Sequence, residues 1–147
     1  MKVGIITCHR AFNYGAVLQT YALQKYLKDH GCEVEIIDYT PQYIRKSYNK
    51  SILKRIIRPI LRHHDFKKSN QVFGNFLNED VSLTKRRYYT YEELKENLPD
   101  FDAYITGSDQ IWNPVIFDGI DSIFFLNFSN EARKISISSS AGSYIFS

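Results

Sequence analysis

The chain opens with alternating apolar and amphipathic blocks that predict a strand, a helix and a second strand. Residues 2–7 (KVGIIT) form a short β-branched run typical of a buried strand. Residues 16–30 place apolar side chains at helical spacing, and Gly31 ends that pattern. A second strand is expected over 34–39, before Pro41. This order at short spacing predicts an α/β fold, a Rossmann-like parallel sheet with flanking helices.

The middle of the chain is predicted to be helical and basic. Residues 52–62 carry isoleucine and leucine on one half of a helical wheel and basic side chains on the other, and Pro59 should kink or end this helix. Further helices are expected over 66–77 and over 90–98, the second opened by a T-x-x-E capping box.

Three more extended segments are expected in the second half of the chain. Residues 101–106 (FDAYIT) indicate a third strand, 123–128 a fourth short extended piece, and 135–140 a further strand. The length of 147 residues fits a single domain over 1–147. A hydrophobic share of 44% and a charged share of 24% are close to the globular average, which excludes a disordered chain.

Charge is distributed unevenly along this domain. Residues 45–68 hold nine basic residues and one acidic residue, which leaves ten basic and fifteen acidic residues elsewhere. We place this segment in a basic helical insertion at about 44–80. Its basic helix has three interpretations: a solvated face over a packing stripe, contact with an anionic membrane surface, or a rim that attracts phosphorylated or acidic glycans. No nucleic-acid partner is expected, because no aromatic-interleaved recognition motif accompanies the charge.

The cysteine and histidine content argues against a disulfide scaffold and against a metal site. The two cysteines are Cys8 and Cys32, and the four histidines lack the spacing of metal ligands. The apolar start is shorter than a signal-peptide core, and no segment approaches the ~20 apolar residues that span a bilayer. We expect a cytoplasmic protein, with the basic helix as a candidate for contact with the inner face of the membrane.

Ligands of an open parallel sheet gather beyond the carboxyl ends of its strands, so the loops there are candidates for a site. The first loop, Cys8–Gly15 (CHRAFNYG), offers His9 and Arg10 just before a helix. The alternative is that Asn13 only caps this helix and Gly15 eases the turn, while His9 and Arg10 lie solvated. The loop matches neither a dinucleotide fingerprint nor a P-loop.

The second loop, Gly107–Pro114 (GSDQIWNP), has the highest density of polar groups and follows the third predicted strand. Trp112 could form a flat wall for a sugar face, although core packing is the favoured interpretation. Asp109 could belong to a site or cap a short helical turn. The third loop, 136–143 (SISSSAGS), could form a phosphate-binding nest, but small residues that permit close packing are the favoured interpretation.

Two stretches closely resemble motifs of the polysaccharide pyruvyl transferase family: FNYGAVLQTYALQKYL at 12–27 and ITGSDQIWNP at 105–114. The run KISISSSAG at 134–142 is similar to a third family motif. The resemblance implies transfer of a pyruvyl group from phosphoenolpyruvate to two hydroxyls of a sugar in a cell-surface polysaccharide. It also implies a two-domain scaffold similar to GT-B glycosyltransferases, with phosphoenolpyruvate as donor substrate and no cofactor.

The resemblance also implies which residues form the site. The first motif matches His9, Arg10, Asn13, Tyr14 and Gly15; the second matches Ser108, Asp109, Gln110, Trp112 and Asn113; the third matches Ser140 and Gly142. Asp109 is expected to act as a base or to orient an acceptor hydroxyl, and His9 to relay a proton. The other residues of the first two motifs are expected to bind substrate, and no metal is implied.

Members of this family are considerably longer than this chain, so the resemblance implies an N-terminal half whose donor-binding cations lie in a C-terminal domain. We therefore expect this chain alone to be incomplete or inactive, with a glycan or lipid-linked saccharide as acceptor and the missing domain, or a separate chain, as partner. The alternative is a noncatalytic α/β binding or interaction module left by truncation. A third interpretation is a membrane-surface adaptor that uses the basic helix.

Overall fold

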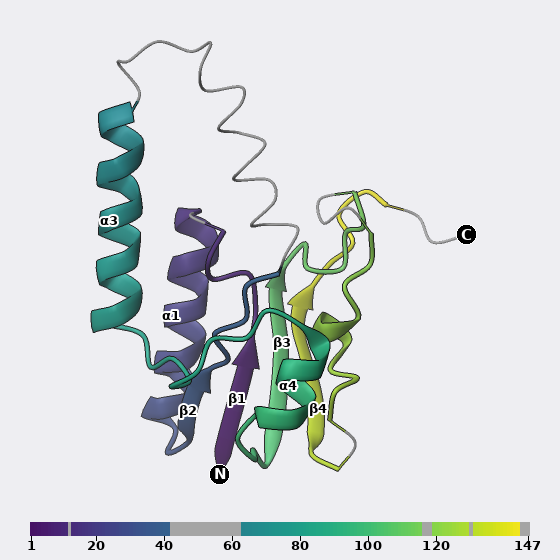
Figure 1. Cartoon of the computed structure of the whole chain (residues 1–147). Coiled ribbons are helices and arrows are strands. Elements are labelled where there is room, and N and C mark those ends of the chain that lie inside the picture. The colour runs from purple at the N-terminus through teal and green to yellow at the C-terminus, as the bar shows by residue number, and fades with distance from the viewer. Residues whose placement is uncertain (12, 42–62, 116–118, 130, 145–147) are drawn as a thin grey trace.

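Four parallel strands form one sheet in a computed structural model that describes residues 1–11, 13–41, 63–115, 119–129 and 131–144 (Figure 1). The strands are β1 (Lys2–Ile6), β2 (Glu33–Ile36), β3 (Ala103–Asp109) and β4 (Arg133–Ser139). Their order across the sheet is β2-β1-β3-β4, and each neighbouring pair is parallel. The predicted α/β fold with a parallel sheet is therefore confirmed, whereas the likeness to a GT-B scaffold stays a prediction.

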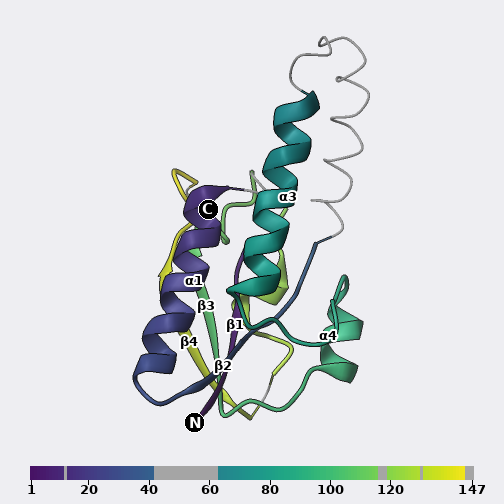
Figure 2. The same ribbon diagram turned by 90° about the vertical axis from the view of Figure 1, so that its left-hand side faces the viewer.

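Helices cover both faces of this sheet. They are α1 (Tyr14–Asp29), α3 (His63–Glu79), α4 (Tyr91–Asn97) and the 3-10 helix η2 (Ser122–Phe125). Figure 2 shows α1 and α4 on opposite sides of the sheet, with α3 beside α1. None of the helices in the described ranges has both the length and the apolar character that a membrane crossing requires.

Among the described residues, the core forms two apolar clusters, one on each face of the sheet. Ile5 of β1 points to the α1 side and packs with Val17 and Phe73, whereas Ile6 points to the other side and packs with Leu94 and its neighbours. Successive side chains of a strand alternate between the two faces, so a strand buried on both faces has an unbroken apolar sequence. This explains why residues 3–6 (VGII) carry no polar side chain.

The predicted helices and strands are present at nearly the expected places, with one error. Residues 123–128 were expected to be extended, but η2 occupies the start of this segment. Asp121 caps the 3-10 turn by accepting a hydrogen bond from the backbone of Ile123, and Leu126 ends it in a left-handed conformation with φ 59°. A short buried apolar run is compatible with either structure, so its periodicity could not identify the turn. The predicted basic helix over 52–62 lies outside the described residues.

Asn13 sets the beginning of α1, the helix whose first turn adjoins the candidate site. Its side-chain Oδ1 accepts a hydrogen bond from the backbone N–H of Gly15 at 2.8 Å, and its carbonyl accepts one from Val17 at 3.0 Å. The free N–H groups of a helix start need such acceptors, and asparagine is among the best residues for this position. The capping interpretation of Asn13 is therefore confirmed.

Replacing Asn13 with alanine should lower the free energy of unfolding by about 1 kcal/mol, because Gly15 loses its acceptor. Chemical denaturation followed by circular dichroism measures the change. Asn75→Ala is the matched control, since Asn75 is an exposed residue inside α3, where alanine favours the helix. Equal stability losses in the two variants would contradict a capping role for Asn13.

Candidate functional site

The loops that follow β1 and β3 lie side by side at the carboxyl end of the sheet, as the parallel order predicts. Gln19 of α1 ties them together: its Nε2 donates to Thr7 Oγ1 at 3.2 Å, and its Oε1 accepts from the Ser108 N–H at 3.0 Å. Thr7 Oγ1 also donates to the carbonyl of Ser108 at 3.4 Å. The expectation that these two loops lie together is confirmed.

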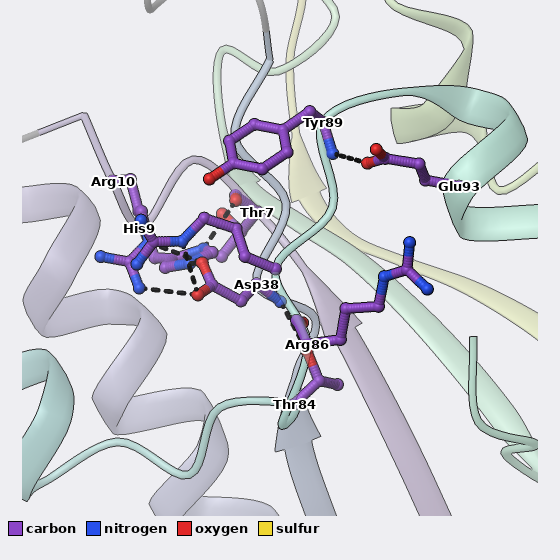
Figure 3. Close-up of polar contacts among 9 residues, drawn as sticks. Thr7, His9, Arg10, Asp38, Thr84, Arg86, Tyr89 and Glu93 are labelled. Carbon is purple, nitrogen blue, oxygen red and sulfur yellow. Dashed lines mark hydrogen bonds and ion pairs between the residues drawn. The ribbon is translucent and has the colours of Figure 1, made fainter. Parts of the chain in front are cut away.

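The loop after β1 places His9 and Arg10 against Asp38, which follows β2 (Figure 3). Arg10 makes a two-point contact with the carboxylate, from Nε to Oδ1 at 2.6 Å and from Nη2 to Oδ2 at 2.7 Å. The side chain of Asp38 is only 7% exposed, and that of Arg10 is 14% exposed. The alternative in which His9 and Arg10 lie solvated is therefore wrong.

Arg87 joins this cluster from the segment before α4. Its Nε donates to Asp38 Oδ2 at 3.0 Å, and its side chain is 43% exposed. Arg86, next to it in the chain, points away from Asp38 in Figure 3, with its guanidinium 5.9 Å from the centre of the Tyr88 ring. Thr84 fixes the backbone of the cluster, because its Oγ1 accepts a hydrogen bond from the N–H of Asp38 at 3.0 Å.

The environment of Asp38 keeps its carboxylate ionised. Burial by itself would raise the pKa of Asp38, but hydrogen bonds from His9 and Arg10, the charge of Arg10 and a hydrogen bond from Arg87 outweigh burial. Together they hold the pKa of this carboxyl far below its usual range. Asp38 is thus a permanent anion that organises the surrounding cations at neutral pH.

His9 is enclosed by the protein. Its side chain has no exposed surface, Nδ1 lies 3.1 Å from the carbonyl oxygen of Thr7, and Nε2 lies 3.2 Å from Asp38 Oδ1. Both neighbouring atoms are acceptors, so the ring satisfies both of them only when each nitrogen carries a hydrogen. The predicted proton relay through His9 stays a prediction, and any such relay would have to involve Asp38.

The second loop presents Asp109 at the end of β3. Asp109 is exposed and has φ 99°, a positive value that side chains rarely adopt and that costs conformational energy. Its Oδ1 accepts a hydrogen bond from the Gln110 N–H at 2.7 Å, and its carbonyl accepts one from the Ser140 N–H at 3.0 Å. Turns, and no helix, follow Asp109 up to Val115, so the carboxylate does not cap a helical turn there.

The remaining residues of the second loop stabilise the loop by hydrogen bonds and packing, and some of them also reach the surface. Gln110 Oε1 accepts from Asn113 Nδ2 at 2.9 Å, and Asn113 is buried. Trp112 is partly buried, as core packing predicts; its ring stacks on that of Phe125, with centroids 5.2 Å apart and planes 10° apart. Phe125 is 43% exposed, so the stacked pair also reaches the surface.

The third loop packs directly on the second. The carbonyl of Ser140 accepts a hydrogen bond from the Trp112 N–H at 3.2 Å. Gly142 has φ 63°, and a Cβ atom there would lie 2.6 Å from Gln110 Oε1 and 2.7 Å from Asn113 Nδ2. These contacts show that the serine-rich segment packs closely on the second loop, which was the favoured interpretation.

Cys8 lies beneath the loops and is unsuited to nucleophilic chemistry. Burial, with the charges of Asp109 and Asp121 as smaller causes, raises the pKa of this thiol far above its usual value. Tyr39 donates a hydrogen bond to Asp121 Oδ2 at 2.8 Å in the same region. Cys8 is therefore a buried neutral thiol, and the acidic groups near it are Asp109 and Asp121.

A hollow of about 510 Å³ lies elsewhere, beside α4 and the amino end of β3. Its walls include Leu94, Phe101, Tyr104 and Phe128, and none of the residues predicted to form the site lines it. We place the candidate site at the carboxyl end of the sheet because the polar and charged groups of all three loops gather there.

Asp38 and Arg87 are the site residues that sequence reasoning missed. Asp38 directly follows the apolar run of β2, so the rule that directs attention to strand ends could have identified it. Arg87 carried no such signal, since it stands in a basic run (KRR) between two predicted helices and reaches Asp38 only through the folded chain.

One of the comparisons with known proteins gives a match. No significant match was found among curated proteins or among solved structures. The sequence model of the family described as polysaccharide pyruvyl transferase matches residues 13–147, which is nearly the whole chain and includes the second and third loops. The chain belongs to the polysaccharide pyruvyl transferase family.

Proposed function

We propose that this chain takes part in the transfer of a pyruvyl group from phosphoenolpyruvate to two hydroxyls of a sugar, which yields a cyclic ketal. The observation that carries the proposal is the exposed carboxylate of Asp109, held at the end of β3 and surrounded by the other loops. Family membership supports a transferase. The acceptor would be a glycan or a lipid-linked saccharide of a cell-surface polysaccharide.

The chemistry requires a base near the sugar. Protonation of the donor at its methylene carbon generates an oxocarbenium-like centre, which a sugar hydroxyl attacks while a base removes the hydroxyl proton. Phosphate then leaves, and the second hydroxyl closes the ring. We assign proton removal to Asp109 because its carboxylate is exposed and forms no ion pair with an arginine or lysine of the described ranges.

The surroundings of Asp109 suit a polyhydroxyl ligand. Ser108 and Gln110 supply a hydroxyl and an amide group, and the stacked rings of Trp112 and Phe125 supply an apolar surface for the face of a sugar. Asn113 is buried and supports this loop through its hydrogen bonds to Gln110 and Val115. Tyr14 is 66% exposed at the start of α1 and adds a phenol to the same end of the sheet. We infer that these groups hold the acceptor while Asp109 acts on its hydroxyl.

A deletion experiment tests the proposal. Cells that lack the gene for this chain should lose the ketal-linked pyruvate of their surface polysaccharide, measured by the loss of its methyl signal in the proton NMR spectrum. Reintroducing the gene should restore the signal. Unchanged pyruvate content of the polysaccharide after deletion would contradict the proposed function.

A further inference from the structure

Two arginine side chains from distant parts of the sequence converge on the buried carboxylate of Asp38. Arg10 occupies both oxygens, Arg87 shares Oδ2 and His9 shares Oδ1. An ionised carboxylate has about four lone-pair sites. Asp38 is therefore saturated, and any further donor on the arginines requires an acceptor from another group.

The cluster has an excess of positive charge. Both guanidinium groups are always protonated, and one carboxylate balances only one of them. Within the described part of the chain, Asp38 is the only carboxylate that forms an ion pair with either arginine. Glu93, the other carboxylate in Figure 3, accepts a hydrogen bond from the backbone of Tyr89 at 2.7 Å instead.

Asp38 does not use all the donors of the two arginines. A guanidinium group has five N–H donors; Arg10 uses two for Asp38, and Arg87 uses one for Asp38 and makes a further hydrogen bond with Tyr89. Donors remain on both side chains. The side chain of Arg87 is 43% exposed, whereas that of Arg10 is 14% exposed, so Arg87 forms the outer part of the cluster.

We propose that Arg10 and Arg87, held in place by Asp38, bind the phosphoryl group of a ligand at the carboxyl ends of β1 and β2. Arg10 uses the edge formed by Nε and Nη2 for Asp38, and Arg87 uses only Nε for it. The remaining donors come from two guanidinium groups on different segments, which suits the tetrahedral oxygens of a phosphate.

The proposed anion site lies at the same end of the sheet as the loop that contains Asp109. Arg10 belongs to the loop that Gln19 ties to Ser108, so a phosphoryl group bound there lies on the same end of the sheet as Asp109. Two sources share this chemistry: the donor phosphoenolpyruvate, or a phosphate that carries the acceptor sugar. That the ligand is a substrate rests on the proposed function, whereas the binding of phosphate does not.

The test is a titration of the ¹⁵N-labelled protein with inorganic phosphate at constant ionic strength, set with chloride to keep screening equal. The Nη–H signals of Arg10 and Arg87 should shift and saturate, since the Nε–H groups of both side chains are already bonded to Asp38. Arg87→Gln should weaken phosphate binding about tenfold or more, the equivalent of one charge-assisted hydrogen bond. Arg86→Gln, which removes the same charge from the neighbouring position, should weaken it less than twofold.

Further titrations identify the source of the phosphate. Phosphoenolpyruvate and a hexose 1-phosphate are compared with pyruvate and the free hexose, which lack the phosphoryl group. Tighter Arg87-dependent binding of phosphoenolpyruvate assigns the site to the donor, and tighter binding of the hexose 1-phosphate assigns it to the acceptor. Either result supports the anion site.

The proposal is overturned if the Nη–H signals of Arg10 and Arg87 in the wild-type protein do not respond to phosphate, a measurement that needs no variant to fold. Equal losses of affinity in Arg86→Gln and Arg87→Gln would also overturn it, since they indicate general charge attraction. Arg87-dependent phosphate binding combined with an unchanged polysaccharide after gene deletion would reject the proposed function and leave the anion site standing.

Discussion

Replacing Asp109 with asparagine is expected to lower the rate of ketal formation by about 10²–10⁴-fold, the contribution typical of a general base. Asparagine tolerates positive φ almost as well as aspartate, and its Oδ1 can still accept the hydrogen bond from Gln110. The substitution therefore removes the basic carboxylate and leaves the loop in place. The measurement is the initial rate of phosphate release from phosphoenolpyruvate in the active enzyme, with the ketal product quantified by NMR.

Asp102→Asn is the matched control for this experiment. Asp102 is an exposed carboxylate immediately before β3, at the opposite end of the strand from Asp109, and its Oδ2 accepts a hydrogen bond from the backbone of Lys2. Its substitution should leave the rate unchanged within a factor of two. An Asp109→Asn enzyme as fast as the wild type would assign Asp109 to loop structure alone.

Replacing Asp38 with alanine should lower the free energy of unfolding by about 3–5 kcal/mol at pH 7, because it leaves two arginines and the buried His9 facing one another without their common anion. Chemical denaturation measures the loss. Asp29→Asn is the control: Asp29 is 58% exposed and pairs with Lys25 on the surface of α1, so its loss should cost less than about 0.5 kcal/mol. Similar losses in both variants would contradict a central role for Asp38.

The contribution of Asp38 to stability should also depend on pH. Its pKa is lower in the folded chain than in the unfolded chain, so the folded state is favoured above the unfolded pKa of about 3.9 and loses this advantage as the pH falls below it. The difference in unfolding free energy between wild type and Asp38→Asn should therefore hold above about pH 5 and shrink as the pH falls from about 4 toward the folded pKa. A difference that stays constant over this range would show that the charge of Asp38 does not stabilise the fold.

The sequence predicted the sheet well because its strands are buried on both faces. Continuous apolar runs such as residues 3–6 (VGII) occur where helices cover a parallel sheet from both sides, and the predicted helices stand between these runs. The same signal failed over 123–128, where an apolar run packs as a 3-10 turn. Burial explains the apolar residues both in the strands and in the 3-10 turn. The feature that distinguishes the turn is the cap that Asp121 forms before it.

The candidate site was predictable where it lies in loops directly after strands and unpredictable where it depends on distant contacts. The loops that contain Arg10 and Asp109 were located from strand order alone, and the structure brings them together. The ion pair of Arg87 with Asp38 joins segments 49 residues apart, and local sequence carries no information about such a contact. The burial of His9 depends on the same tertiary contacts.

The packing of the third loop on the second has a consequence for the entropy of ligand binding. Two backbone hydrogen bonds join Ser140 to Asp109 and Trp112, and Gly142 leaves no space between its backbone and the side chains of Gln110 and Asn113. These segments are fixed when β3 and β4 pair, so their loss of conformational freedom occurs during folding and not when a sugar arrives. A ligand that meets loops already ordered in this way retains more of its interaction energy as affinity, and under the proposed function this ligand is the acceptor sugar.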